Sequence, residues 1–573
     1  MKYLLPFFKK YKKESLLAPL FKMLEATFDL IVPLVVAQII NVGIQTHDAH
    51  FVITRFCILL ALAVIGLLCS FTAQYFAAKA AIGTATELRH NLLTHIQTLD
   101  FAALDGIGTA TLITRMTADV NQVQNGLNMF LRLFLRSPFI VFGAMVMAFA
   151  IHAQTALVFA AVILVLFCIV FGIMYMTNPL YKKQQKALDG VTTSVKENLA
   201  GVRVVRAFGG EEREQQRMES EIGRLQSIQQ HVGRISALLN PLTYVVINGG
   251  IIFILWFGAK FVDGGTLLSG DVIALVNYLS QILVELLKLA NLIVLLSKAV
   301  VSMGRIGDVL DMTPDMQFGN ITCGSSEHEA VRFENVGLTY PQAAESALSG
   351  VSFTAKKGET IGIIGGTGSG KSTLISLIAR FYDATEGTVY LEGEPIQSWQ
   401  QNALRRKIYV VMQKTQLFSG TIRSNLLYGK KDATDEELWQ ALTLAQAADF
   451  VREKPGGLEA EVEQGGRNLS GGQKQRLSIA RALVAQPDIL ILDDSASALD
   501  YATDAALRRA LKQLPQKTTV FIISQRTASI RRADTILVLE DGRLAGIGTH
   551  DELLQNCSVY REINESTTKK AGE

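Results

Sequence analysis

The chain has 573 residues, of which 49% are hydrophobic, and it carries a net charge of +3 from 55 basic and 52 acidic side chains. This length exceeds what one hydrophobic core serves, so we expect at least two domains. The near balance of charge argues against a nucleic-acid partner. The five cysteines show no CxxC or other metal-ligand spacing, so we expect neither a disulfide framework nor a metal–thiolate site.

The first half of the chain is much more apolar than the second and contains six segments long enough to span a bilayer, which takes roughly 20 apolar residues per helix. The predicted spans are 16–44, 56–78, 129–151, 156–176, 238–262 and 272–301. Six such runs in succession argue against a buried soluble core. The N-terminus has no compact apolar stretch with a small-residue cleavage site, so we expect no removable signal peptide.

The links between these spans alternate in length and charge. Links one, three and five are short and nearly free of Lys and Arg, whereas links two and four are long and basic. Basic residues gather on the cytoplasmic side of membrane proteins. We therefore expect a multi-pass protein of the cytoplasmic (inner) membrane with both termini in the cytoplasm. The long links have helical periodicity, which predicts that the spanning helices continue beyond the bilayer.

Several ionisable residues interrupt the spans, and charge inside a bilayer is costly enough to mark candidate sites. They are Lys22, Glu25, Asp29, Arg132, Arg136, Glu285 and Lys288. Lys22 with Glu25, and Glu285 with Lys288, are three residues apart and can neutralise each other on one helix face. A structural role and a transport role are both open for these pairs. Asp29 has no cation nearby in its own span, so we predict that it lines a polar cavity.

The second half of the chain carries a motif typical of nucleotide-binding proteins. The sequence GGTGSGKS at 365–372 fits GxxxxGK[ST] and lies between a strand-like run and a helix-like run. Backbone N–H groups of such a loop surround phosphate oxygens, Lys371 reaches the terminal phosphates and Ser372 ligates Mg²⁺. We therefore predict an ATP site built by Gly365, Gly366, Thr367, Gly368, Ser369, Gly370, Lys371, Ser372 and Thr373.

Two further segments complement this loop. The apolar run 489–492 ends in Asp493, which suits a buried strand that delivers a carboxylate to Mg²⁺. The sequence LSGGQ at 469–473 precedes a helix-like run and offers backbone donors to an anion, but it has no lysine of its own. One phosphate group does not easily need two such cradles from one chain. We therefore expect this second cradle, formed by Ser470, Gly471, Gly472 and Gln473, to close on nucleotide bound to a partner chain.

Together these features resemble the half-transporters of the ABC exporter family, whose signature is LSGGQ, over the whole chain. The resemblance implies a type IV fold: a membrane domain of six helices with long cytoplasmic extensions, then an α/β P-loop nucleotide-binding domain. The implied boundaries are 1–310 for the membrane domain, 311–328 for a linker, 329–566 for the nucleotide-binding domain and 567–573 for a tail.

The same resemblance implies roles for individual residues. Tyr340 would stack on adenine, and Gln413 would contact both Mg²⁺ and the membrane domain, so Ser372, Gln413 and Asp493 would form the metal set. Residues 497–500 would cross a dimer interface. Segments 108–119 and 201–212 match family segments that carry coupling helices, which dock on the nucleotide-binding domains.

Two catalytic positions depart from the family pattern. The family has glutamate after Asp493, as the base that polarises water, and here Asp494 is one methylene shorter; misplacement by about 1 Å can cost on the order of 10²-fold in rate. The family has histidine near 525 to contact the γ-phosphate, and Gln525 cannot carry a positive charge there. General acid–base catalysis contributes roughly 10²- to 10⁴-fold. We interpret this ATP site as degenerate: it binds ATP but hydrolyses it poorly.

These departures predict one subunit of a heterodimer, because a homodimer would carry Asp and Gln in both sites. A second half-transporter would supply Glu and His, and the signature of this chain would complete its competent site. We expect ATP-driven export of hydrophobic or amphipathic compounds, of multidrug or lipid type, by alternating access. A dedicated peptide, lipid or metabolite transporter and an ATP-gated regulatory channel stay open as alternatives.

The placement of Asp29 gives a first testable prediction. Asp29→Ala removes a carboxylate from the predicted cavity, so uptake of cationic dyes into inside-out vesicles should change because a cation loses its counter-charge. Uptake across a panel of cationic compounds measures the effect. Transport unchanged for every member of the panel would contradict the prediction.

Overall fold

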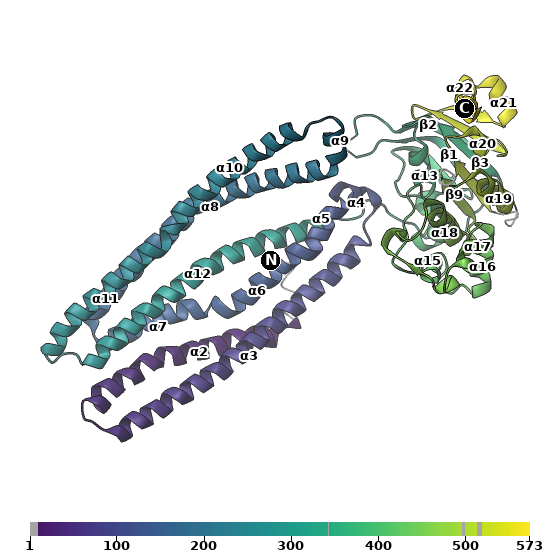
Figure 1. The fold of residues 1–573 in the computed structure, drawn as a ribbon. Coiled ribbons are helices and arrows are strands. Elements are labelled where there is room, and N and C mark those ends of the chain that lie inside the picture. The colour runs from purple at the N-terminus through teal and green to yellow at the C-terminus, as the bar shows by residue number, and fades with distance from the viewer. Residues whose placement is uncertain (1–9, 342, 495–498, 513–517, 573) are drawn as a thin grey trace. The chain divides into compact units, whose positions relative to one another are not determined.

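The computed structural model describes residues 10–341, 343–494, 499–512 and 518–572 (Figure 1). Its contacts divide the chain into two compact units. One extends to Gln97 and resumes from Gly108 to Met312, and the other combines Thr98–Ile107 with the chain from Thr313 onward. The first unit is built from helices and the second from sheets and helices.

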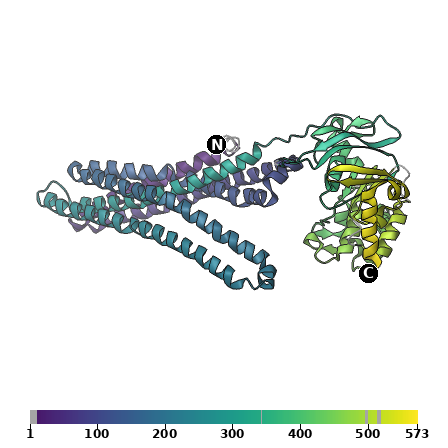
Figure 2. The ribbon, with the colours of Figure 1, turned by 90° about the horizontal axis from the view of Figure 1, so that it is seen from above.

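The described residues of the first unit contain six helical stretches that are long and apolar enough to cross a membrane, which confirms the predicted number of spans. They are α2 (Lys12–Gln38) with η1 (Ile39–Ile44); α3 (Ala49–Ile96); α5 (Thr109–Thr114), η2 (Arg115–Asp119), α6 (Val120–Leu133) and α7 (Arg136–Ile151); α8 (Ala153–Ala200); α10 (Glu211–Ala237) with α11 (Leu239–Asp263); and α12 (Ser269–Leu310). Figure 2 shows these helices from a second direction. They extend well beyond the apolar segments, as the periodicity of the long links predicted.

Helix α12 is the central packing element of this unit. Its face from Ala274 to Leu286 is buried in a core shared with α2, α7, α8 and α11. The Tyr278 hydroxyl donates to the carbonyl of Leu30 at 2.6 Å, and Asn41 accepts from the backbone N–H of Gly270 at the start of α12. The opposite faces of several helices expose large apolar side chains, such as Leu60 and Leu67 on α3, as lipid-facing surfaces do.

The second unit is organised around a six-stranded sheet in the order β12-β11-β3-β10-β9-β6. Its strands are β3 (Thr360–Gly365), β6 (Ile408–Val411), β9 (Ile489–Asp493), β10 (Thr519–Ile523), β11 (Thr535–Glu540) and β12 (Arg543–Gly548), of which only β12 is antiparallel to its neighbour. A second sheet has the order β2-β1-β4-β5, from β1 (Glu329–Leu338), β2 (Leu348–Lys356), β4 (Glu386–Leu391) and β5 (Glu394–Pro395). A small pair joins β7 (Gly420–Thr421) to β8 (Glu461–Val462).

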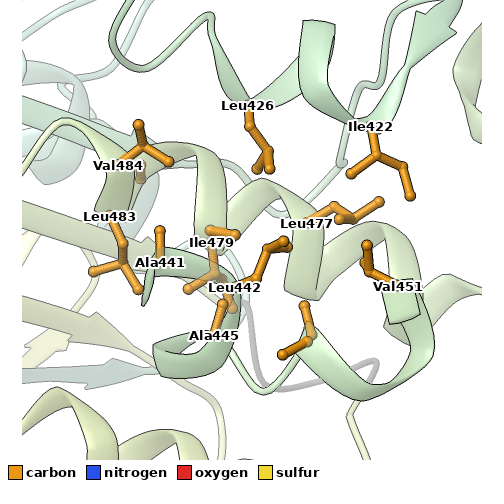
Figure 3. Packing of buried hydrophobic residues seen from close by; sticks show 14 of the residues in the cluster. Ile422, Leu426, Ala441, Leu442, Ala445, Val451, Leu477, Ile479, Leu483 and Val484 are labelled. Carbon is orange, nitrogen blue, oxygen red and sulfur yellow. The ribbon is translucent and has the colours of Figure 1, made fainter. Parts of the chain in front are cut away.

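Helices cover these sheets in two groups. Around the second sheet and β3 lie α13 (Lys371–Ile378) and α14 (Gln401–Lys407), and the C-terminal part adds α20 (Thr527–Ile530), α21 (His550–Asn556) and α22 (Ser558–Gly572). The other group comprises α15 (Ile422–Leu426), α16 (Asp435–Leu444), α17 (Ala448–Glu453) and α18 (Gly471–Val484), with α19 (Tyr501–Leu511) beyond β9. Figure 3 shows the apolar core of this second group, where Leu442, Leu477 and Ile479 meet.

The short helix α4 (Phe101–Ile107) belongs to the second unit although it lies between two membrane spans in sequence. The ring of Phe101 packs on Phe381 with centroids 4.5 Å apart, and the Tyr382 hydroxyl donates to the carboxylate of Asp105. The expectation that 108–119 carries the first docking helix is therefore wrong, because that segment forms α5 and η2 in the membrane unit. Within 201–212, the structure has the short helix α9 (Val202–Ala207); its docking stays a prediction.

The core of Figure 3 gives a stability prediction. Leu442 on α16 is fully buried, so Leu442→Ala should destabilise the unit by about 2–5 kcal/mol through lost burial and a residual cavity. Hydrogen exchange of the α16 and α18 amides in the full-length protein measures this. Gln440→Ala, on the exposed face of the same helix, is the matched control and should change stability by less than about 0.5 kcal/mol. Equal protection from hydrogen exchange in the two variants would contradict the role given to Leu442 in this core.

Candidate functional site

Three parallel strands end side by side and define the candidate site. Residue Ile523 of β10 pairs with Asp493 of β9 on one side and with Ile363 of β3 on the other. The N–H of Asp494 donates to the carbonyl of Ile523 at 3.1 Å, and the N–H of Ser524 donates to that of Ile363 at 3.1 Å. The carboxyl ends of parallel strands are where open α/β sheets bind ligands. The predicted phosphate loop, metal carboxylate and switch position therefore follow three neighbouring strands.

The phosphate loop joins β3 to α13. Gly368 and Gly370 have φ values of +83° and +94°, the left-handed region that glycine adopts without strain, and Gly370 caps α13. A side chain added at Gly366 or Gly368 would meet nothing within 4 Å, so the loop is open on that side, where backbone N–H groups can approach an anion. Lys371 begins α13, and its Nζ donates to the carbonyl of Gly365 at 2.9 Å.

Asp493 and Asp494 lie close enough to Lys371 for their charges to interact, in a partly buried corner. Burial raises the pKa of the Asp493 carboxyl, and the neighbouring charge of Asp494 raises it further. Burial also raises the pKa of Asp494, against the opposing charge of Arg526 and a hydrogen bond from Gln413 Nε2 at 3.3 Å. Burial lowers the pKa of Lys371, and the two carboxylates oppose that shift. This electrostatic arrangement suits a site where a cation joins the carboxylates.

The oxygen donors at this corner fit Mg²⁺. Ser372 lies in the first turn of α13, Asp493 ends β9, and Gln413 reaches Asp494 from the segment after β6. A hydroxyl, a carboxylate and an amide oxygen are hard ligands, which Mg²⁺ prefers over nitrogen or sulfur. Among the described residues no group of three or more His, Cys, Asp or Glu side chains could hold a metal alone, so nucleotide oxygens and water would complete the shell.

The two departures from the family pattern lie at this same edge. Asp494 has a φ of +43°, a left-handed conformation that short Asp side chains tolerate better than most. Gln525 is exposed just after β10, and Arg526 follows it at the start of α20. Arg526, a cation that the sequence motifs did not single out, acts through its charge on Asp494.

The predicted adenine contact, Tyr340, is held in place from two sides. Its hydroxyl donates to Thr373 Oγ1 at 3.2 Å, so it is tied to the helix that follows the phosphate loop. Its ring meets the Tyr382 ring edge-on, with centroids 5.0 Å apart and planes at 86°. Because Tyr382 also binds Asp105 on α4, a chain of contacts leads from the phosphate-loop helix through Tyr340 to the docked helix. Sequence reasoning missed Tyr382; the aromatic pair Phe381–Tyr382 directly after α13 was the available signal.

The signature segment lies at the start of another helix. Ser470 caps α18, and Gln473 reciprocates: the Gln473 N–H donates to Ser470 Oγ at 3.3 Å, and the Ser470 N–H donates to Gln473 Oε1 at 3.0 Å. A side chain at Gly471 would meet no atom within 4 Å, which leaves the helix end open. In the part of the chain that the structure describes, no hydrogen bond joins these side chains to the phosphate loop. Of the predicted interface loop 497–500, Ser497 and Ala498 lie outside the described residues.

A membrane unit of six long helices, joined to a parallel-sheet unit that carries a phosphate loop and a second helix-end cradle, defines an ATP-driven membrane transporter of exporter architecture. The chain belongs to the ABC transporter family: residues 15–286 match the model of the ABC transporter transmembrane region, and residues 348–497 match the model described as ABC transporter. The six-helix membrane domain followed by one nucleotide-binding domain, expected from the sequence, is thereby confirmed.

Relatives and solved structures extend this assignment. The chain is 35% identical to the "Uncharacterized ABC transporter ATP-binding protein YfiB" of Bacillus subtilis (strain 168), over 99% of each chain. It is 34% identical to the "Probable multidrug resistance ABC transporter ATP-binding/permease protein YheI" of the same organism, over 83% of this chain and 82% of that protein. The fold matches the structure of a bacterial Atm1-family ABC exporter with ATP bound, with a TM-score of 0.80 over 96% of this chain and 97% of that chain at 24% identity.

The contact between Tyr382 and Tyr340 can be tested by a pair of substitutions. Tyr382→Ala removes the ring that supports Tyr340, so ATP affinity should fall roughly 2- to 10-fold, the equivalent of an aromatic pair worth about 0.5–1.5 kcal/mol. Tyr382→Phe keeps the ring and loses only the hydrogen bond to Asp105, so affinity should stay within about twofold. Titration with a fluorescent ATP analogue measures both. Equal affinities for the two variants would contradict the role given to the ring.

Proposed function

We propose that this chain is the degenerate-site subunit of a heterodimeric ABC exporter that moves amphipathic compounds out of the cytoplasm. ATP at the site built on Lys371 holds the nucleotide-binding domains together, and hydrolysis occurs mainly at the site that the signature segment of this chain completes. Closure of the two domains switches the membrane helices between inward- and outward-facing states. Coupling of this kind requires that ATP bind one state more tightly than the other.

The observation that carries the proposal is that Asp494 and Gln525 both occur just after neighbouring strands, β9 and β10, at the same edge of the sheet. The predicted phosphate loop and metal carboxylate Asp493 lie at the same edge, whereas the residue at the base position is one methylene short and the residue at the switch position has no titratable ring. The Asp494 carboxylate also accepts a hydrogen bond from Gln413 Nε2 at 3.3 Å. A second chain with Glu and His at these positions would supply the hydrolysis that this site lacks.

Other observations support export of amphipathic compounds. The name of the relative YheI describes it as a probable multidrug resistance transporter. The membrane unit of this chain contains a cavity of about 430 Å³ whose lining combines apolar side chains, such as Val32 and Ile140, with charged ones, such as Asp29. Such a mixed lining suits a compound that has both an apolar body and a polar group.

Steady-state ATPase activity of the chain alone and with a candidate partner tests the heterodimer. The partner would be a half-transporter encoded next to this chain that carries Glu and His at the two altered positions. We expect slow hydrolysis by this chain alone and a rise of roughly 10²-fold or more on co-assembly, because the partner supplies the missing base and switch. Vigorous hydrolysis by the chain alone that Asp494→Ala abolishes would overturn the proposal.

A restored site provides a check in which the only partner is a second copy of this chain. The double variant Asp494→Glu/Gln525→His rebuilds the family pattern in this chain, and its ATPase activity should exceed that of the natural chain by about 10²-fold or more. Lys371→Ala in the restored background is the control and should return activity to background, because the phosphate loop loses its lysine. If the double variant hydrolysed ATP no faster than the natural chain, Asp494 and Gln525 would not be what limits hydrolysis, and the proposal would fail.

A further inference from the structure

Six charged side chains from three helices form one connected network inside the membrane unit. Arg136 of α7 lies at its centre, with Nη1 2.7 Å from Glu285 Oε1 of α12 and Nη2 2.9 Å from Asp29 Oδ2 of α2. Glu25 lies 3.7 Å from the same guanidinium group. The spacing of three residues predicted the pairs Lys22–Glu25 and Glu285–Lys288, which the structure confirms, and Arg136 is the cation that Asp29 lacks in its own span.

Each lysine of the network forms one ion pair, and Lys22 also donates to the hydroxyl of Ser70 at 3.1 Å. Lys22 donates to Glu25 at 2.6 Å, and Lys288 donates to Glu285 at 2.8 Å. Three cations (Lys22, Arg136 and Lys288) and three anions (Glu25, Asp29 and Glu285) sum to zero charge. A neutral, hydrogen-bonded set is the form in which ionised groups persist at membrane depth.

Burial divides the network into an inner part and a rim. The side chains of Arg136 and Glu285 are 10% and 5% exposed, whereas those of Asp29 and Lys288 are 45% and 41% exposed. Asp29 and Lys288 both line the cavity of about 430 Å³, together with Arg136 and Gln281. In the described structure, Gln281 Oε1 is buried without a hydrogen-bond donor. The cavity therefore presents a carboxylate and an ammonium group beside apolar walls, each partly exposed and each in one ion pair of the network.

We propose that this cavity is a binding site for a zwitterionic amphiphile, a ligand with an amino group and an anionic group on an apolar body. The amino group pairs with Asp29, the anionic group pairs with Lys288, and Val32, Val36 and Ile140 contact the apolar body. A singly charged ligand would leave the neutral network with an uncompensated charge in a poorly solvated site, whereas a zwitterion keeps the sum at zero. This inference rests on the proposed export function and names its substrate class.

Two kinds of molecule carry this chemistry: a zwitterionic phospholipid and an alkylated amino acid. One fluorescent alkyl chain can bear four head groups, which are phosphoethanolamine, an α-amino acid, an ammonium group alone and a phosphate group alone. Fluorescence anisotropy with the full-length chain in lipid nanodiscs gives the affinity for each probe. We expect at least one zwitterionic probe to bind about tenfold or more tightly than both singly charged probes, and the tighter of the two zwitterions identifies the source.

Two substitutions separate the two arms of the site. Asp29→Asn keeps the shape of the side chain and removes its charge, so binding of the zwitterion and the ammonium probe should fall about tenfold while the phosphate probe is retained. Lys288→Met should weaken the zwitterion and the phosphate probe and retain the ammonium probe. Ser280→Ala is the matched control, because Ser280 lines the same cavity but its hydroxyl donates to the carbonyl of Val276; it should bind all four probes as the natural chain does.

Zwitterions that bind no better than the singly charged probes would overturn the inference. Parallel loss of all four probes in both charge variants, with the Ser280→Ala control intact, would also overturn it, because it would indicate a structural network and not two ligand arms. The assay needs neither ATP hydrolysis nor a partner. Failure of the heterodimer proposal would appear instead in ATPase activity, so the two failures are distinguishable.

Discussion

The parallel register of β3, β10 and β9 determines what this ATP site can contain. Backbone hydrogen bonds fix Asp494 against Ile523 and Ser524 against Ile363, so the residues that follow the three strands occupy one edge. Side chains can change there while the backbone frame stays the same. The sheet and the phosphate loop with Lys371 are intact, so the site keeps the framework expected to bind nucleotide. Its departures from the family pattern are confined to two side chains, the shorter acid Asp494 and the neutral amide Gln525.

Side-chain contacts in the same unit join the helix after the phosphate loop, α13, to α4. Tyr340 touches Thr373 on one side and Tyr382 on the other, and Tyr382 holds Asp105 of α4. Movement of the Tyr340 ring would reach α4 through one ring contact, with Tyr382, and one hydrogen bond, from Tyr382 to Asp105. These contacts lie within one compact unit, so the helix that follows the phosphate loop and α4 are joined by direct packing.

The sequence predicted features that depend on local pattern and missed those that depend on distant contacts. Six spans followed from apolar length, and Lys22 with Glu25 followed from their spacing on one helix. Arg136 could not be assigned its partners, because they lie 107 and 149 residues away in other helices. The docked helix was placed at 108–119 by resemblance, whereas Phe101 and Asp105 bind an aromatic pair 280 and 277 residues further on, a contact that no local pattern encodes.

We propose above all that the ATP site of this chain binds ATP and hydrolyses it poorly. The direct measurement is the residence time of a photo-crosslinkable ATP at the Lys371 site of the assembled transporter during steady-state hydrolysis, compared with the partner's site. The account predicts that nucleotide trapped by this chain outlasts several cycles of hydrolysis and is recovered as ATP. Nucleotide that exchanges and is hydrolysed at equal rates in both sites would contradict it.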